Sequence, residues 1–334
     1  MDIDIVVPWV NGNDPKWIQK KQNFSGGAVT EDRDSKNVEL NGNEKYRDSG
    51  TLLYVLRSIE KYAPWIHHVF LITDEQTPDW INEKFEKLTI VDHKDYIPSR
   101  WLPTFSSNPI ILNVHRIPRL SEHFILFNDD MILNREVKST DFFSQSGKPV
   151  DIGVYSVIPS FEKFSHLILN NTNVINKYFS KWNGIKRKFS GFFNFKYGKS
   201  LIRTVLALPW DGISGFYNPH MPIPYLKSTF ETVWKKEGQW LSDTSSHKFR
   251  SDDDLTDWVM RYWQIQSGDF KAGSIKFSKY YLQNETQKII NDLKTSKHHM
   301  ICINDTPMTK DADIDLSLKK ALELKFDRSS KFEK

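Results

Sequence analysis

The chain has 334 residues, of which 39% are hydrophobic and 26% charged, and its formal net charge is +4 at pH 7. These values are typical of a globular protein and exclude an intrinsically disordered one. The length fits one large α/β domain or a domain with an insertion. The small net charge does not indicate nucleic acid, and we expect none as a partner. Cys302 is the only cysteine, which excludes an intrachain disulfide.

The N-terminus indicates both location and fold. Asp2 and Asp4 interrupt the first residues, so no basic segment precedes an apolar one as in a signal peptide. The chain also lacks the uninterrupted run of about 18 apolar residues that a spanning helix needs. We therefore expect a cytoplasmic protein. Residues 3–7 are apolar and mostly β-branched, which predicts a buried strand at the very start.

Strands and helices are expected to alternate after this first strand. Residues 13–46 are polar and contain a Gly-Gly pair, so we expect a long loop or lid there. Apolar residues recur at helical spacing over residues 52–62, and short apolar runs at 69–73 and 88–91 predict two further strands.

A helix over residues 110–120 and a strand over 124–127 complete this part of the pattern. Strands that alternate with helices predict an α/β fold, with a mostly parallel sheet and flanking helices. In such folds, ligands bind at the carboxyl ends of the strands.

Residues 159–210 interrupt this alternation. They contain no Asp or Glu from 163 onward but many basic and aromatic residues, and we interpret them as a helical, basic insertion. The insertion would divide the α/β domain into residues 1–158 and 211–325, followed by a charged tail over 326–334. A basic surface suits an anionic partner, but it could equally be a solvated face balanced by acidic residues elsewhere.

Beyond the insertion, the pattern predicts a helix over residues 223–237, another from about 253, and a strand over 300–303. Cys302 is expected to be a small hydrophobic residue of that strand. The last ten residues are charged and are expected to fray.

Polar residues follow the first predicted strand. Pro8 cannot continue a central strand, and Asn11-Gly12 turns the backbone, which leaves Trp9 and Asn11 at the strand's carboxyl end. There, a flat ring could stack on a base or sugar and an amide could recognise its polar edge. Alternatively, Trp9 fills the core at the strand end.

Arg47 and Asp48 precede the helix predicted over 52–62. A guanidinium at a helix start suits phosphate, whereas the alternative is that Asp48 or its neighbour only caps the helix.

Asn128-Asp129-Asp130 follows the strand predicted over 124–127. Two adjacent carboxylates repel one another, and a divalent cation would relieve that repulsion, so Asp129 and Asp130 suit Mg²⁺ or Mn²⁺. An acidic turn without a metal is the alternative. Asp74, which ends the second predicted strand, could line the same edge.

Two further motifs precede helices in the last third of the chain. His220 could act as a general base at neutral pH, and Arg250 could hold a phosphoryl group. A single histidine is more often structural, so these residues leave the reaction open.

Taken together, these motifs resemble those of the Stealth family of sugar-1-phosphate transferases. That family includes bacterial capsular and exopolysaccharide phosphotransferases and the catalytic subunit of animal N-acetylglucosamine-1-phosphotransferase. Four blocks match in order: residues 3–12, segments between 47 and 131, the block at His220-Met221-Pro222, and residues 250–255. The first block differs in having Pro8 where the family more often has Thr.

The resemblance implies a nucleotide-sugar-binding, GT-A-like fold that transfers a hexose-1-phosphate from a nucleotide-sugar, typically a UDP-sugar, to a hydroxyl of an oligosaccharide or lipid-linked acceptor. A nucleoside monophosphate leaves. Separately from the resemblance, the basic, aromatic insertion fits a lipid-linked acceptor or an anionic glycan phosphate, and we expect peripheral contact with the inner membrane face through it. By this resemblance, three residues would be catalytic: His220 as the base, Arg250 as the phosphate clamp, and Asp130. Asp129 and Asp130 would bind the metal. Nine residues would bind substrate: Trp9, Asn11, Gly12, Arg47, Asp48, Asp74, His115, Arg116 and Asp253.

Two alternatives stay open. The acidic pair alone would also suit a metal-dependent glycosyltransferase that releases a nucleoside diphosphate. The aromatic and basic surface alone would suit a glycan-binding module without catalysis.

Overall fold

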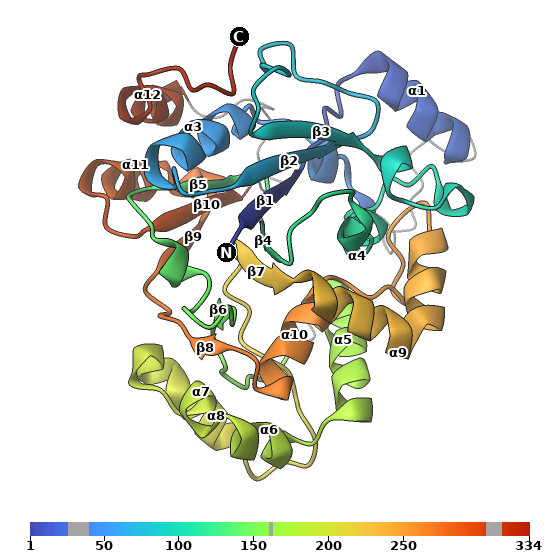
Figure 1. Cartoon of the computed structure of the whole chain (residues 1–334), viewed down its shortest axis with the longest axis vertical. Helices are drawn as coiled ribbons and strands as arrows, with labels where there is room; N and C mark the ends of the chain where they lie inside the picture. The colour runs from blue at the N-terminus through green and yellow to red at the C-terminus, as the bar shows by residue number, and fades with distance from the viewer. Residues whose placement is uncertain (26–39, 160–162, 305–315) are drawn as a thin grey trace.

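The computed structural model describes residues 1–25, 40–159, 163–304 and 316–334. Its centre is a five-stranded sheet in the order β3-β2-β1-β4-β7 (Figure 1). The first four strands are parallel, and β7 pairs with β4 in the antiparallel direction. This confirms the predicted α/β fold with a mostly parallel sheet. The strands are β1 (Ile3–Pro8), β2 (His68–Thr73), β3 (Leu88–Asp92), β4 (His123–Leu126) and β7 (Ile223–Leu226).

The order of the strands reverses between β1 and β4. The chain places β2 and then β3 on one side of β1, and β4 on the other side. The strand order therefore switches direction between β1 and β4, at their carboxyl ends. In open α/β sheets, ligands bind at such a switch point.

Each face of the sheet is buried by its own group of helices (Figure 1). In β1, Ile3, Ile5 and Val7 belong to one core cluster and Val6 to the other, because successive side chains of a strand point to opposite faces. The first cluster includes residues of α3 (Leu52–Tyr62), α11 (Thr286–Thr295) and α12 (Leu316–Lys325). The second includes residues of α4 (Ser107–Leu112), α9 (Lys227–Ser246) and α10 (Trp258–Ser267).

Two smaller sheets extend this core. β10 (Met300–Asn304) lies between β5 (Met131–Leu133) and β9 (Ser278–Leu282), and β6 (Val150–Asp151) pairs with β8 (Lys271–Ala272). Short 3-10 helices fill the connections: Asn43–Tyr46, His93–Asp95, Ser99–Trp101, Val114–Arg116, Ser139–Asp141, Phe195–Ser200 and Gln283–Glu285.

The expected insertion is helical, as predicted. It contains α5 (Phe164–Tyr178), α6 (Lys181–Arg187), α7 (Phe189–Phe192) and α8 (Leu201–Ala207). α5 packs on α10, and its Val174 and Ile175 belong to the second core cluster. The segment therefore shares a core with the sheet, and its limits as a separate unit stay a prediction.

Three local predictions were wrong. Part of the expected loop at 13–46 is a helix, α1 (Pro15–Phe24), which Asp14 caps by accepting a hydrogen bond from the backbone N–H of Lys16. The helix expected from residue 223 begins at Lys227, because Ile223–Leu226 pairs with β4. The helix expected over 110–120 is the shorter α4, and residues 26–39 of the expected loop lie outside the described residues.

The C-terminal tail does not fray. Phe332 is 3% exposed and packs edge-on against Phe85 with 5.0 Å between ring centroids. The Arg57 guanidinium donates two hydrogen bonds to the Glu333 carboxylate, at 2.9 and 2.6 Å. The tail is charged, as predicted, but one of its charges neutralises a partly buried arginine of α3.

Replacing Phe332 with alanine should therefore lower the free energy of unfolding by about 3–5 kcal/mol, the cost of emptying a buried aromatic site. Phe195→Ala is the matched control, because Phe195 is 98% exposed and its loss should change stability by less than about 0.5 kcal/mol. Urea denaturation measures both. Equal midpoints for the two variants would show that the tail is not part of the core.

Candidate active site

The turn after β4 presents two carboxylates at the carboxyl end of the sheet. The backbone N–H of Phe127 donates to Val6 of β1, and that of Met131 donates to Asn128 across the turn. The carbonyl of Asp130 accepts a hydrogen bond from Ile303 of β10 at 3.0 Å. The turn is thus fixed by both the large sheet and its neighbour, beside the switch point.

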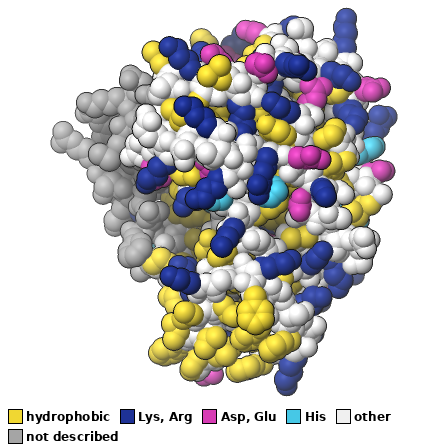
Figure 2. Space-filling model, turned by 90° about the vertical axis from the view of Figure 1, so that its left-hand side faces the viewer, with side chains coloured by type: hydrophobic (Ala, Val, Ile, Leu, Met, Phe, Trp, Pro, Cys, Tyr) yellow, Lys and Arg dark blue, Asp and Glu magenta, His cyan; other side chains and the backbone are white. Residues whose placement is uncertain are grey.

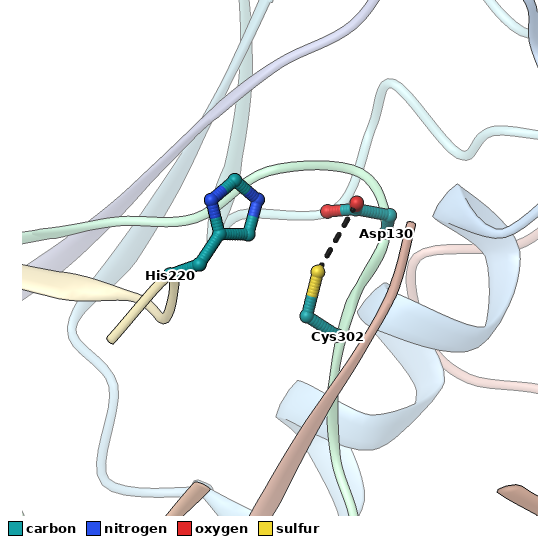
Figure 3. A group of neighbouring side chains, drawn as sticks. All are labelled: Asp130, His220 and Cys302. Atoms are coloured by element: carbon teal, nitrogen blue, oxygen red, sulfur yellow. Dashed lines mark hydrogen bonds between the residues drawn. The ribbon is translucent and has the colours of Figure 1, made fainter. Parts of the chain in front are cut away.

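Asp130, His220 and Cys302 meet at this turn, although they come from three distant segments (Figure 3). Their ligand atoms all lie within 4.8 Å of one another. The Cys302 thiol donates to Asp130 Oδ2 at 3.2 Å. His220 has a positive φ of 44°, and its ring lies edge-on to Tyr280 at 5.1 Å. A non-glycine residue in this left-handed conformation is uncommon, so the surrounding structure holds the ring in place.

Burial determines the protonation of these groups. It raises the pKa of Asp129 well above its ordinary value, and the negative charges of Asp130 and Asp48 raise it further. Burial also raises the pKa of Asp130, although the nearby His220 and the thiol of Cys302 oppose that shift. It lowers the pKa of His220, which favours the neutral imidazole that a general base requires.

The carboxylates fit a hard divalent cation. Among the described residues, Asp130 Oδ1 is buried without a hydrogen-bond partner, and the Asp129 carboxyl adjoins two further acids. Oxygen donors in this arrangement suit Mg²⁺ or Mn²⁺. A thiol is a soft donor that suits these hard cations poorly, and burial and the Asp130 carboxylate raise the pKa of Cys302.

Trp9, Asn11 and Gly12 follow β1, as predicted. Trp9 is 8% exposed and lies in the core, which favours the alternative that it fills the strand end. The backbone of Asn11 exchanges two hydrogen bonds with the Gln76 side chain. Gly12 donates to the carbonyl of Tyr46, and a Cβ at Gly12 would overlap that oxygen. These contacts fix the loop after β1 against two neighbouring segments.

Residues 45–48 lie next to the carboxylates. Asp48 accepts a hydrogen bond from Gly50 at 2.8 Å, and its charge raises the pKa of Asp129. The Lys45 charge lowers the pKa of His220. Arg47, between them, is partly exposed. The structure therefore brings Arg47 and Asp48 to the same place as the carboxylate turn.

A series of aromatic contacts links the segment at Tyr46 to the residue before Arg250. Tyr46 packs on Trp17 at 5.2 Å, Trp17 on Phe105 at 5.6 Å, and Phe105 stacks on Phe249 at 5.3 Å. The guanidinium of the next residue, Arg250, donates to the Leu40 carbonyl at 3.2 Å and to Ser107 Oγ at 2.8 Å. Arg250 is thus held between Leu40 and the start of α4.

Asp254, not Asp253, organises the loop that carries Arg250. The side chain of Asp253 is exposed, whereas Asp254 is fully buried. Asp254 is hydrogen-bonded to the His247 ring at 2.6 Å and accepts from Asn108 at 2.8 Å. Removing one partner of a buried charge costs about 3–5 kcal/mol, so Asp254 is a structural constraint on Arg250.

Asp74 lies at the same edge of the sheet, at the carboxyl end of β2. It forms an ion pair with Lys20 of α1 at 2.6 Å, and Lys20 also contacts Glu75 at 3.3 Å. Asp74 therefore anchors α1, and its other oxygen has no partner among the described residues.

His115 and Arg116 lie elsewhere. They precede β4, so they sit near its amino end, opposite the carboxylate turn. The His115 ring packs between Phe230 and Trp234, with 5.8 Å between centroids in both cases, and Arg116 lies over the Trp234 ring at 4.8 Å. The structure does not bring this pair to the other predicted site residues.

Several residues of the site were not predicted. Cys302 was expected to be only a hydrophobic residue of a strand, and Gln76 and Asp254 carried no prediction. Cys302 and Asp130 are 172 positions apart, so no local pattern could have placed the thiol beside the carboxylate. The sequence does not show which of the consecutive residues Asp253 and Asp254 is buried, so it could not predict that Asp254 holds the loop.

Comparison with known proteins identifies the family of this chain. The chain matches the family model described as Stealth protein conserved region 1 over residues 1–28, and that of conserved region 2 over residues 45–151. These ranges contain the loop after β1 and the carboxylate turn. A fold and site of this kind define a transferase of the Stealth class.

Curated relatives cover the whole chain. The exopolysaccharide phosphotransferase cps2G of Lactiplantibacillus plantarum is 41% identical over 100% of this chain and 96% of its own length. The capsular polysaccharide phosphotransferase WcwK of Streptococcus pneumoniae is 42% identical over 99% and 98%. The chain therefore belongs to the Stealth family of polysaccharide phosphotransferases.

Among solved structures, the galactosyltransferase LgtC in complex with donor and acceptor sugar analogues aligns over 99% of this chain and 97% of its own, with a TM-score of 0.41 and 7% identity.

Within the described residues, no helix combines the length and apolar composition needed to cross a bilayer.

The packing of His115 predicts a structural role for it. Burial, aided by the Arg116 charge, lowers the pKa of His115 from 6.5 to about 3. The unfolded chain therefore binds a proton below pH 6.5 that the folded chain rejects. This contribution to stability is present above pH 6.5 and is lost as the pH falls toward 3.

His115→Phe should make the urea midpoint less dependent on pH in that window and should retain activity. His166→Phe, at an exposed position, is the control and should leave the wild-type pH dependence unchanged. A parallel loss of stability in His115→Phe and the wild type would contradict this role.

Proposed function

We propose that this chain transfers a hexose-1-phosphate from a nucleotide-sugar, most simply a UDP-sugar, to a hydroxyl of a glycan acceptor in capsule or exopolysaccharide synthesis. The observation that carries the proposal is the partly buried His220, whose pKa is lowered by burial, close to Asp130 at the carboxylate turn that follows β4. The Stealth family membership and the names of the relatives support the same reaction class.

The step takes place at phosphorus. The acceptor hydroxyl attacks the phosphorus that bears the sugar, and a new P–O bond forms as the bond to the bridging oxygen of the pyrophosphate breaks. The nucleoside monophosphate leaves with that oxygen, and the hydroxyl proton passes to His220. The carboxylate of Asp130 then stabilises the imidazolium by its charge, as it already opposes the lowering of the histidine pKa.

Asp129 and Asp130 would hold the divalent cation, Mg²⁺ or Mn²⁺. When bound, such an ion neutralises charge on the pyrophosphate. The acidic turn supplies the oxygen ligands, and its fixed hydrogen bonds to two sheets keep those oxygens oriented before substrate arrives.

The donor would lie along the carboxyl edge, between the loop after β1 and the Arg250 loop. Arg47 and Arg250 would contact its phosphates, since a guanidinium can bind two phosphate oxygens at once. Asn11 and Gly12 would form the opposite wall through their backbone. The acceptor would be an oligosaccharide or a lipid-linked glycan, and we expect the protein to act in the cytoplasm.

The products decide between this reaction and its alternative. Incubation with a panel of UDP-sugars, oligosaccharide acceptors and Mg²⁺, followed by mass analysis, should show UMP and a phosphodiester in equal amounts. Release of UDP and a glycan without phosphate would indicate an ordinary glycosyltransferase and contradict the proposal.

In the same assay, His220→Ala should lower kcat by about 10²- to 10⁴-fold, the usual contribution of a general base. His166→Ala is the matched control and should keep wild-type activity, because that ring is exposed. If His220→Ala were as active as the control, His220 would not be the base.

A further inference from the structure

Helix α8 exposes its apolar face to solvent. Ile202, Val205 and Leu206 are 60%, 49% and 67% exposed, whereas the inward residues Thr204 and Ala207 are buried. Residues three and four positions apart share one face of a helix, so the three exposed side chains form one stripe. A surface helix normally has the opposite arrangement, with its apolar stripe toward the core.

Other apolar side chains extend this stripe into a patch. Trp182, Phe189, Phe195 and Trp210 are between 52% and 98% exposed. In Figure 2, hydrophobic side chains gather at the lower end of the molecule, where Figure 1 places α7 and α8. Of the 15 exposed large hydrophobic side chains in the described residues, nine lie between residues 157 and 210. Contiguous apolar patches of this kind mark interaction sites.

The segment that carries the patch is strongly basic, and the exposed Asp211 that follows Trp210 is the acid nearest to it in the sequence. No Asp or Glu occurs from residue 163 to 210. Lys186, Arg187, Lys199 and Arg203 are exposed in this segment, and Figure 2 shows Lys and Arg side chains beside the apolar ones. By contrast, the buried Lys181 donates to main-chain carbonyls and serves the fold.

Buried aromatic residues of the same segment anchor the patch to the core. The Phe192 ring is fully buried and stacks on Tyr155 at 5.0 Å. Tyr197 is also fully buried and donates to the carbonyl of Gly191. Exposed and buried aromatic residues thus alternate along one short segment, and the buried ones fix the orientation of the exposed ones.

We propose that the face formed by α6, α7 and α8 docks on a bilayer surface that contains anionic lipid. Aromatic and aliphatic side chains enter the boundary between headgroups and acyl chains, while the surrounding cations attract the negative headgroups. A second copy of this chain fits less well. In a two-fold interface the patch would meet itself, so its many positive charges would face one another with few acids to offset them.

One cavity is lined by residues of both the docking segment and the segment around His220. Phe195, 98% exposed, is followed by Lys196, which lines a cavity of about 290 Å³. Pro219, Met221 and Pro222 line the same cavity and flank His220 on both sides. Docking would therefore bring a lipid-linked acceptor to the base. This last step rests on the proposed function, whereas docking itself does not.

Vesicle co-sedimentation without donor or acceptor tests the docking face. Wild-type protein should bind phosphatidylcholine vesicles that contain phosphatidylglycerol, and more weakly at high salt. Phe195→Ser/Leu206→Ser/Trp210→Ser should weaken this binding at least about tenfold. Ile18→Ser/Leu282→Ser/Leu324→Ser is the matched control, because it removes three exposed apolar side chains outside the patch and should bind like wild type.

Melting temperatures and turnover on a soluble acceptor show that both variants are folded and active. The proposal is overturned if wild type does not bind these vesicles, or if the patch variant and the control bind equally. It is also overturned if the patch variant loses self-association instead of vesicle binding. Because binding is measured without turnover, its outcome is independent of which product the enzyme makes.

Discussion

Two adjacent carboxylates at the end of a buried strand are the constraint on which the rest of the site depends. Asp129 and Asp130 repel one another, and burial makes that repulsion more costly. The turn persists because its backbone is bonded to β1 and β10. Because the two carboxylates repel one another, the turn favours binding of a cation. The lowered pKa of His220 favours the neutral imidazole, which can accept a proton.

Other parts of the molecule serve to position this edge. Gln76 fixes the loop after β1, and Asp254 holds the loop of Arg250. Cys302 hydrogen-bonds one oxygen of Asp130, which leaves the other oxygen without a partner among the described residues. The site is therefore assembled from loops that are each anchored by a buried polar side chain.

The sequence predicted what local pattern determines. The first four strands were short apolar runs in the sequence. The residues that follow them could be assigned to one sheet edge, because the carboxyl ends of parallel strands lie at the same edge. Contacts between distant segments were not predictable. Pairing with β4 makes Ile223–Leu226 a strand, and the tail is ordered by Arg57 and Phe85. Asp254 is buried whereas Asp253 is exposed, and no pattern in the sequence predicts this difference.

The most direct test is a crystal structure with Mn²⁺ and a non-hydrolysable UDP-sugar analogue, with the metal located by anomalous diffraction. We expect Mn²⁺ bound by the carboxylates of Asp129 and Asp130, with the pyrophosphate beside it and the phosphorus that bears the sugar facing His220. A metal held by His220 and Cys302, or a nucleotide bound away from the end of β4, would contradict it.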